Sequence, residues 1–379
     1  MANSPTMIPV SRPHLTAEDI QAVQQALEAG YLSGDAPIVG EFEASFSAAI
    51  GRRFGVAVAN GSVALDAAIH ALNVGEGDEV LVPSFTIASC LFAILRTGAT
   101  PIFVDSDVET WNMSPTHFAS LVTPRTKALL AVHIYGLPID MDPVMKICHE
   151  NGIAVIEDAA ESHTVTYKGR QCGTFGIAST FSFYPNKAIT TGEGGMIVTD
   201  DEQFKDRLRM LRNLAFRLPP GRRFIHDEIG WNFRMSSLQA ALGKSQLTRM
   251  SMVTKEKRDI GLKYHRLLVG HEMLSMQPTA TSYSDNKFWV AGVLLDEHLD
   301  ALEVASRLRT AGIDTRPFFY PLHQQPLLAN YGLARQPQLP VAERLGRDGL
   351  YLPSFVGITT EEIERSAAEL VQVVDALAT

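Results

Sequence analysis

The sequence predicts an α/β fold in which a mostly parallel β-sheet carries helices on both faces, followed by a smaller C-terminal α+β domain. From residue 52 onward, short apolar segments rich in Val, Ile and Phe alternate with segments of helical spacing. This alternation is typical of β-α-β units. The strand segments are continuously apolar, as strands buried on both faces are. The alternation changes after about residue 235, which indicates a second domain.

Seven segments are predicted as strands because each is short, apolar and bounded by Gly, Pro, Asn or Asp. In chain order they are FGVAVAN (54–60), EVLVPSF (79–85), TPIFVD (100–105), KALLAVHIYG (127–136), GIAVIEDAA (152–160), STFSFYP (179–185) and GGMIVTD (194–200). Four predicted helices lie between or after them: SVALDAAIHAL (62–72), IASCLFAILRTG (87–98), DPVMKICHENG (142–152) and EQFKDRLRMLRNL (202–214).

The C-terminal part of the sequence contains fewer elements. A helix that begins at about residue 236 is expected to continue to about residue 270 and to form a spine between two domains. After it we expect a strand at 287–296, a helix at 299–312, a strand at 313–319 and a final helix at 360–378. We therefore expect a large domain at residues 1–245, including the N-terminal segment, and a small domain at residues 246–379.

Composition narrows the class of function. The 379 residues are 46% hydrophobic and 20% charged, which favours a large folded core over a disordered chain. The net charge of −9 does not favour binding to nucleic acid or to an anionic membrane. Three scattered cysteines, no apolar segment near the ~20 residues of a spanning helix and no signal-peptide pattern indicate a cytoplasmic protein. No zinc spacing is present, so no metal is expected.

Two glycine-containing segments do not complete a nucleotide-binding motif. GKS at 243–245 lacks the upstream glycine, because position 238 is Leu238. GEGGMI at 192–197 has Ile197 where the dinucleotide-binding motif needs its last glycine. The sequence therefore supports neither nucleotide-binding fold.

The most informative residue is Lys187, in FSFYPNKAITTGEGG at 181–195. It follows an aromatic segment that is expected to enter the interior. A free lysine has a pKa of about 10.4, and burial or a neighbouring cation lowers that pKa and frees the amine lone pair. Such an amine attacks carbonyl carbons and forms imines. The alternative is a strand-end lysine with its head in water, and position alone favours that alternative.

Asp158 and Glu161, in IEDAAESH at 156–163, are placed at the carboxyl end of a predicted strand. Open α/β sheets bind their ligands at this edge. A pyridinium nitrogen needs a fixed anion, because the anion keeps the nitrogen protonated and the ring electron-withdrawing. The alternative role for Asp158 is to cap a following helix.

Gly61 and Ser62 lie between a predicted strand and a predicted helix. Free N–H groups there, the helix dipole and the hydroxyl form an anion site, and Ser182 is placed within reach of the same anion. The alternatives are N-capping by Ser62 and a buried Ser182 bonded to backbone. An amine, a carboxylate and an anion site match three parts of one ligand, pyridoxal 5'-phosphate (PLP).

Eight segments, spread over nearly the whole chain, are similar to those of one protein family. They are NGSVALDAAIHAL, GDEVLVPSFT, GATPIFVDSDVETWNM, VIEDAAESH, YKGRQCGTFG, FSFYPNKAITTGEGGMIVTDD, IGWNFRMSSLQAAL and TRPFFYPLH. The chain thereby resembles the DegT/DnrJ-type sugar aminotransferases, PLP enzymes of fold type I, the fold of aspartate aminotransferase. HDEIGWNFRM, TRPFFYPLHQQP and LPSF carry a narrower similarity to the GDP-perosamine synthases, which aminate C4 of GDP-4-keto-6-deoxymannose.

The resemblance implies a role for each site residue. Lys187 is the lysine that forms a Schiff base with PLP, and Asp158 pairs with the pyridine nitrogen. Glu161 lies beside the ring, near its phenolic oxygen. The phosphate is held by Gly61, Ser62, Ser182 and, from the neighbouring subunit of a homodimer, Asn232. The alternative for the asparagine is a local turn in a loop.

One position departs from the pattern of the family. Its members commonly have an aromatic residue two positions after Phe85, stacked on the cofactor ring, whereas this sequence has Ile87 there. The resemblance therefore implies either that Ile87 packs on the ring or that Phe85 takes that role.

The implied reaction moves an amino group from L-glutamate, which leaves as 2-oxoglutarate, to a nucleotide-linked 4-keto-6-deoxy sugar. The expected pair is GDP-4-keto-6-deoxy-D-mannose and GDP-perosamine. Arg217, Arg222 and Arg223, in a Pro-Gly loop, are candidates for the diphosphate, with a solvated basic loop as the alternative. Arg316 and His323 are candidates for the sugar or nucleotide.

Three other functions stay open. A related aminotransferase would use a UDP- or dTDP-linked sugar or would aminate C3. A PLP-dependent sugar dehydratase of this family has histidine in place of the lysine, so Lys187 argues against it. A non-catalytic sugar-binding relative would be expected to lack Lys187 or Asp158, and both are present.

Overall fold

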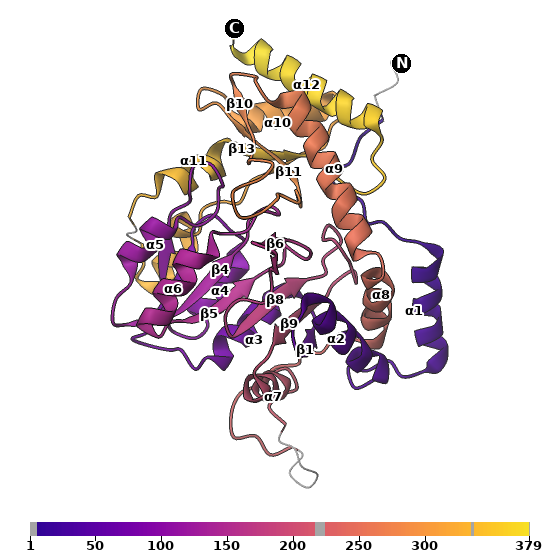
Figure 1. The fold of residues 1–379 in the computed structure, drawn as a ribbon, viewed down its shortest axis with the longest axis vertical. Coiled ribbons are helices and arrows are strands. Elements are labelled where there is room, and N and C mark those ends of the chain that lie inside the picture. The colour runs from indigo at the N-terminus through magenta and orange to yellow at the C-terminus, as the bar shows by residue number, and fades with distance from the viewer. Residues whose placement is uncertain (1–5, 217–223, 335–336, 379) are drawn as a thin grey trace.

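The computed structural model describes residues 6–216, 224–334 and 337–378. Its two main sheets lie in separate parts of the molecule, a seven-stranded sheet in the larger part and a four-stranded sheet in the smaller part (Figure 1). Helix α9 (Met250–Leu268) runs from one part toward the other. No helix within these described ranges has both the length and the apolar character needed to span a membrane.

The large sheet contains all seven predicted strands. In spatial order they are β1 (Phe54–Val58), β9 (Gly195–Thr199), β8 (Ala178–Ser182), β5 (Ala154–Asp158), β4 (Thr126–Val132), β2 (Glu79–Pro83) and β3 (Thr100–Val104). β9 pairs antiparallel with both β1 and β8, and the other neighbouring pairs are parallel. Only β9 therefore runs against the other strands, which confirms the prediction of a mostly parallel sheet.

Each face of the large sheet has its own core, because alternate residues of a strand point to opposite faces. Val80 and Val82 belong to one core, whereas Leu81 belongs to another. The helices of the first face are α3 (Gly61–Ala71), α4 (Ala88–Leu95) and α7 (Glu202–Leu211). Those of the opposite face are α2 (Pro37–Ile50), α5 (Pro115–Leu121) and α6 (Met141–Asn151). Helices cover both faces, as predicted, and this explains why the strands are continuously apolar.

The smaller part is built on an antiparallel sheet. Its strands, in spatial order, are β10 (Leu274–Ser275), β11 (Ala291–Leu295), β13 (Gly349–Leu352) and β12 (Arg316–Pro317). Helices α9, α10 (Ala301–Thr310) and α12 (Thr360–Ala378) share a core with this sheet. The remaining elements are α1 (Ala17–Ala29), the ribbon of β6 (Thr166–Tyr167) and β7 (Arg170–Gln171), α8 (Ser237–Leu247), two 3-10 turns (Leu322–Gln324 and Pro326–Tyr331) and α11 (Pro340–Asp348).

The N-terminal segment joins the smaller core. Ile8 is bridged to Ile313 and is buried among residues of the small sheet and α12. The division of the chain near residue 245 remains our proposal. The first described residues nevertheless lie with the C-terminal part, whereas the sequence placed them with the large domain.

The predicted spine is two helices, α8 and α9, which are separated at Thr248 and Arg249. Arg249 forms an ion pair of 2.6 Å with Asp19 of α1. The Asp19 carboxylate, only 1% exposed, also accepts hydrogen bonds from Ser245 and Gln246. This buried carboxylate fixes the end of α8 against α1, so the prediction of one continuous helix is wrong.

We expect Phe46→Ala to lower the free energy of unfolding by about 3–5 kcal/mol, because it leaves a cavity in an aromatic cluster. The Phe46 ring is fully buried, with its centroid 5.0 Å from that of Phe181 and 5.1 Å from that of Phe183. Urea titration of purified protein measures the change. The control Leu302→Ala removes a side chain that is 74% exposed and should change stability by less than about 0.5 kcal/mol. Equal losses in the two variants would contradict this prediction.

Candidate active site

A cavity of about 660 Å³ opens at the carboxyl-terminal edge of the parallel strands. Seven of the predicted site residues line it, and they come from separate parts of the chain. These residues are Gly61, Ser62, Ile87, Asp158, Glu161, Ser182 and Lys187. Because the strands β5 and β8 end here, the sheet itself brings the amine, the carboxylates and the hydroxyls together.

Lys187 is buried, so the alternative of a lysine head in water is wrong. Its side chain is 10% exposed, and its Nζ lies 3.5 Å from Glu161 Oε1. The same Nζ lies 3.6 Å from the centroid of the Trp289 ring. Burial lowers the pKa of Lys187, while the negative charges of Glu161 and Asp158 oppose that shift. A lowered pKa makes the neutral, nucleophilic amine easier to form.

Glu161 is held in place by backbone. Its Oε2 accepts a hydrogen bond of 2.9 Å from the N–H of Tyr135. Burial raises the pKa of Glu161 to about 7, although the Lys187 ammonium and the Tyr135 N–H favour the carboxylate. The side chain can therefore hold or release a proton near neutral pH, directly beside the lysine amine.

Asp158 is the last residue of β5, and its carboxylate is 4% exposed. Oδ1 accepts a hydrogen bond of 3.1 Å from the N–H of Ala160, and Cys90 Sγ lies 3.6 Å from Oδ2. Burial raises the pKa of Asp158, and the Ala160 N–H and the Lys187 charge counteract this. No helix follows directly after Asp158 in the described chain, so the helix-capping alternative is not supported.

The predicted anion site is a recess at the start of α3. The helix begins at Gly61, and its N-cap is Asn60, whose side chain accepts from the Val63 N–H at 3.0 Å. Ser62 is therefore free of the capping role, and its Oγ lies 2.6 Å from Ser89 Oγ. A Cβ at Gly61 would lie 2.8 Å from the Cβ of Ser182, so a side chain there would fill the recess.

These residues fit PLP. Backbone N–H groups at a helix start and serine hydroxyls suit a phosphate, and a buried carboxylate suits a protonated ring nitrogen. Beside Asp158, the buried Thr180 Oγ1 lines the same cavity and has no hydrogen-bond partner among the described residues. The cavity thus offers polar groups that the protein itself does not satisfy.

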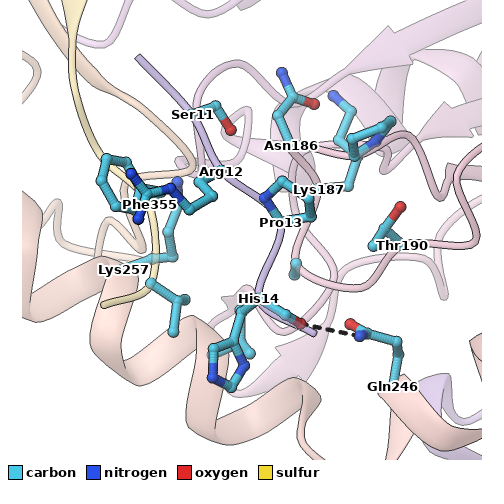
Figure 2. A pocket seen from close by; sticks show the side chains of 14 residues that line it. Ser11, Arg12, Pro13, His14, Asn186, Lys187, Thr190, Gln246, Lys257 and Phe355 are labelled. Carbon is cyan, nitrogen blue, oxygen red and sulfur yellow. Dashed lines mark hydrogen bonds between the residues drawn. The ribbon is translucent and has the colours of Figure 1, made fainter. Parts of the chain in front are cut away.

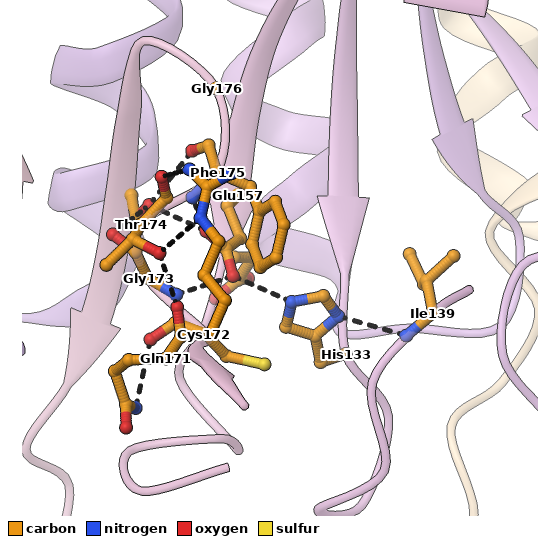
Figure 3. Close-up of polar contacts among 12 residues, drawn as sticks. His133, Ile139, Glu157, Gln171, Cys172, Gly173, Thr174, Phe175 and Gly176 are labelled. Carbon is orange, nitrogen blue, oxygen red and sulfur yellow. Dashed lines mark hydrogen bonds and ion pairs between the residues drawn. The ribbon is translucent and has the colours of Figure 1, made fainter. Parts of the chain in front are cut away.

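Glu157, the neighbour of Asp158, points to the opposite face and forms a buried network with His133 (Figure 3). His133 Nδ1 accepts from the Ile139 N–H at 3.2 Å, so Nε2 carries the proton that is donated to Glu157 Oε1 at 2.8 Å. Glu157 also accepts hydrogen bonds from the N–H groups of Gly173 and Phe175.

His133, Glu157 and Cys172 also lie close enough together to hold a metal ion. The hydrogen bonds of the network already use the lone pairs and protons of the histidine and the glutamate. We therefore interpret this cluster as a structural support that fixes β5 and the loop after it.

Ile87 and Phe85 differ in their access to the cavity. Ile87 is 46% exposed and lines the cavity, whereas Phe85 is fully buried and packs on Tyr135 and Phe318. Phe85 therefore cannot take the role at the ring face, and packing of Ile87 on the cofactor remains a prediction.

Other predicted residues lie outside the cavity of their own chain. Asn232 is exposed and bridged to Asn213, and its contact with a neighbouring subunit stays a prediction. Arg316 is half-exposed and ion-paired with Asp314 at 3.1 Å. Arg217, Arg222 and Arg223 lie outside the described residues.

His323 does not line the cavity that contains Lys187. Its ring is buried outside the cavity, and Nδ1 lies 2.6 Å from Ser84 Oγ while Nε2 lies 3.1 Å from Glu343 Oε1. Both ring nitrogens are hydrogen-bonded within the chain, and a role of His323 in a sugar or nucleotide site stays a prediction.

Three aromatic residues of the cavity lie far from Lys187 in the sequence, and the sequence did not predict them. Trp289, Phe319 and Tyr351 come from the C-terminal part of the chain and close the cavity opposite the large sheet. The segment around Trp289 has only the apolar pattern of a strand, which contains no signal for a residue in the site.

A second, small cavity of about 30 Å³ lies behind Lys187 and is shown in Figure 2. Arg12 and His14 from the N-terminal segment and Lys257 from α9 line it. Lys257 donates a hydrogen bond to the carbonyl of Ser354. Burial lowers the pKa of Lys257 to about 7, and the charge of Lys187 acts in the same direction.

A mostly parallel sheet with one reversed strand, a buried lysine and a carboxylate at the end of β5 define a PLP-dependent transferase of fold type I. Comparison with known proteins supports this assignment. The aminotransferase TlmJ from Streptoalloteichus hindustanus superimposes with a TM-score of 0.91 at 29% identity, covering 98% of this chain and 100% of the other. DesV of S. venezuelae superimposes with a TM-score of 0.90 at 31% identity, covering 99% of each chain.

Sequence comparison gives the family. The model of the DegT/DnrJ/EryC1/StrS aminotransferase family matches residues 13–371. The GDP-perosamine synthase of Escherichia coli O157:H7 is 37% identical over 94% of this chain and 95% of its own length. That of Caulobacter vibrioides is 37% identical over 97% of this chain and 98% of its own length. The chain belongs to the DegT/DnrJ/EryC1/StrS aminotransferase family, and its cofactor is PLP.

We expect Glu161→Gln to lower the pKa of Lys187 further, because the variant removes a negative charge that favours the ammonium. Competitive acetylation of the protein without cofactor, followed by mass spectrometry of the Lys187 peptide, gives the midpoint of its titration. Lys146, whose side chain is 74% exposed, is an internal control and should keep its midpoint. An unchanged or raised Lys187 midpoint would show that the two side chains are not coupled.

A second expectation concerns stability and pH. The pKa of Lys257 is about 7 in the folded protein, against 10.5 for a free lysine, so the unfolded chain binds more protons between these pH values. Stability should therefore rise with pH across this window because of Lys257. We expect the melting temperature of the wild type, relative to Lys257→Met, to increase from pH 7 to pH 9. A difference that stays constant with pH would refute the assignment.

Proposed function

We propose that this aminotransferase moves the amino group of L-glutamate to C4 of GDP-4-keto-6-deoxy-D-mannose, which yields 2-oxoglutarate and GDP-perosamine. The observation that carries the proposal is the buried Lys187 amine, which shares one cavity with Asp158, Glu161 and the recess at Gly61. The choice of sugar is supported by full-length similarity to GDP-perosamine synthases from three organisms.

The residues of the cavity have different roles in the proposed reaction. PLP, when bound, supplies an electron-withdrawing ring that stabilises negative charge at the reacting carbon. Lys187 Nζ holds the cofactor covalently in one state and, once free, moves a proton to or from the reacting carbon. The Asp158 carboxylate keeps the ring nitrogen protonated, and Glu161 lies beside the lysine as its counter-charge.

The phosphate would be held at the start of α3. The N–H groups of Gly61 and Ser62 and the hydroxyls of Ser62 and Ser182 face one recess. We propose that Asn232 of a second copy of the chain completes this recess in a homodimer.

The sugar would bind in the cavity. Tyr184, Trp289, Phe319 and Tyr351 line this cavity, and aromatic faces with polar tips suit the mixed surface of a pyranose. Arg222 and Arg223 remain our candidates for the diphosphate, because guanidinium groups bind phosphate oxygens in pairs. Arg316, in β12 of the C-terminal part and ion-paired with Asp314, remains a candidate for the sugar or nucleotide.

The test is a panel of GDP-, UDP- and dTDP-linked 4-keto-6-deoxy sugars, each incubated with L-glutamate and analysed by mass spectrometry. We expect the GDP-linked mannose derivative to be aminated fastest, with an equal amount of 2-oxoglutarate. Lys187→Ala should lower turnover by at least about 100-fold, because it removes the amine that moves the proton. Borohydride treatment should attach the cofactor to Lys187 in the wild type and to no residue in the variant.

Preference for a UDP- or dTDP-linked sugar would overturn the choice of substrate. Absence of amination throughout the panel, in protein that carries PLP on Lys187, would overturn the proposed sugar substrate class.

A further inference from the structure

The amine of Lys187 has a defined position in the cavity. Its Nζ lies 3.6 Å from the centroid of the Trp289 ring and 3.5 Å from Glu161 Oε1. An ammonium over an aromatic face is attracted by the quadrupole of the ring, most strongly for tryptophan and more so where water is excluded. Trp289 is only 9% exposed. The amine therefore lies close to both an aromatic ring and a carboxylate.

The ring and the carboxylate are fixed by the same residue. The backbone N–H of Trp289 donates to the carbonyl of Tyr135 at 2.9 Å. The N–H of Tyr135 donates to Glu161 Oε2 at 2.9 Å. The indole Nε1–H donates to the carbonyl of Asn186, next to Lys187, at 2.9 Å. The plane of the ring is thus tied both to the chain that carries the lysine and to the segment that holds the carboxylate.

The backbone at Tyr135 and Gly136 has an unusual conformation, which this arrangement requires. Tyr135 has a φ of 59° and Gly136 a φ of 96°, and left-handed backbone is unfavourable for a tyrosine. A Cβ at Gly136 would lie 2.7 Å from the backbone nitrogens of Phe288 and Trp289. The close approach of the two segments therefore requires glycine at 136. An unfavourable tyrosine conformation is retained where it places Trp289 over the lysine.

We propose that Trp289 is a positioning residue that holds the free amine of Lys187 as an ammonium against its indole face whenever the lysine is not joined to the cofactor. The inference deepens the proposed function, on which it rests, because an aminotransferase frees this lysine once in every cycle. Trp289 precedes β11, so the ring comes from the C-terminal part of the chain, while the lysine lies in the loop between β8 and β9 of the large sheet.

Other charged and titratable groups also act on the amine. Glu161 and Asp158 lie in the segment at the end of β5, His163 follows them, and Lys257 approaches from α9. All four are unchanged in variants of Trp289. A change in the titration of Lys187 in such variants therefore reports the ring.

The experiment is competitive acetylation of the full-length protein, both without cofactor and after treatment of the holoenzyme with L-glutamate. In Trp289→Leu the midpoint of Lys187 titration should fall by about 0.5 to 1 pH unit, because the ammonium loses its aromatic face. Trp289→Phe retains a ring face and should show a smaller fall. Trp231→Leu is the matched control and should show none, because Trp231 packs on Phe233 and His70 instead.

Fluorescence gives a second readout that does not require the leucine variant to fold. The emission of the wild type should change with pH at the midpoint measured for Lys187, because an ammonium on the ring face alters the emission of the indole. That change should persist in Trp231→Phe and be absent in Trp289→Phe.

An unchanged or raised Lys187 midpoint in Trp289→Leu would overturn the proposal. So would emission that does not follow the lysine, or that follows it equally in Trp289→Phe. These measurements use protein without cofactor as one arm, so they stay informative if the sugar panel fails. Conversely, a successful panel with unmoved midpoints would leave the proposed function intact and remove only the role of Trp289.

Discussion

A buried lysine ammonium is stable only if nearby groups replace the interactions that it loses with water, and the site is built around this requirement. Removing an ammonium from water is unfavourable by several kcal/mol unless opposite charge or polarisable groups replace the solvent. Lys187 finds Glu161 at 3.5 Å and the face of Trp289 at 3.6 Å. These groups replace the lost hydration only in part, because burial still lowers the pKa of Lys187 and raises the pKa of Glu161. Partial compensation keeps both groups near the point at which a proton can move.

Strand β5 serves the framework and the site at once. Its last two residues, Glu157 and Asp158, point to opposite faces of the sheet. Glu157 binds His133 and the N–H groups of the 173–175 loop, which holds the strand end in place. Asp158 can then project an acidic group into the cavity at a fixed position. A carboxylate on each face thus explains why two acidic residues stand together at the end of an apolar strand.

The fold is predictable from the sequence where the pattern is local. All seven strands of the large sheet were predicted, because burial on both faces leaves a continuous apolar pattern. Helix α1 was not predicted, since Ile20 and Leu27 are exposed and no buried stripe marks the helix. The separation of α8 from α9 depends on Asp19, which lies far away in the sequence.

The residues of the candidate site are likewise predictable from the sequence only where the signal is local. Lys187 and the residues that share its cavity follow strand ends, and motifs mark them. Trp289 is held by a backbone hydrogen bond to Tyr135. Hydrogen bonds to Ser84 and Glu343 hold His323 outside the cavity. Tyr135 and Ser84 are distant in the chain from the residues that they hold, so only the folded structure reveals these contacts. The N-terminal segment has a related consequence for biosynthesis: Val10 pairs with Asp314, 304 residues further along. Arg12 and His14 line the small cavity behind Lys187, so the contact that places their segment can form only after residue 314 has been synthesised.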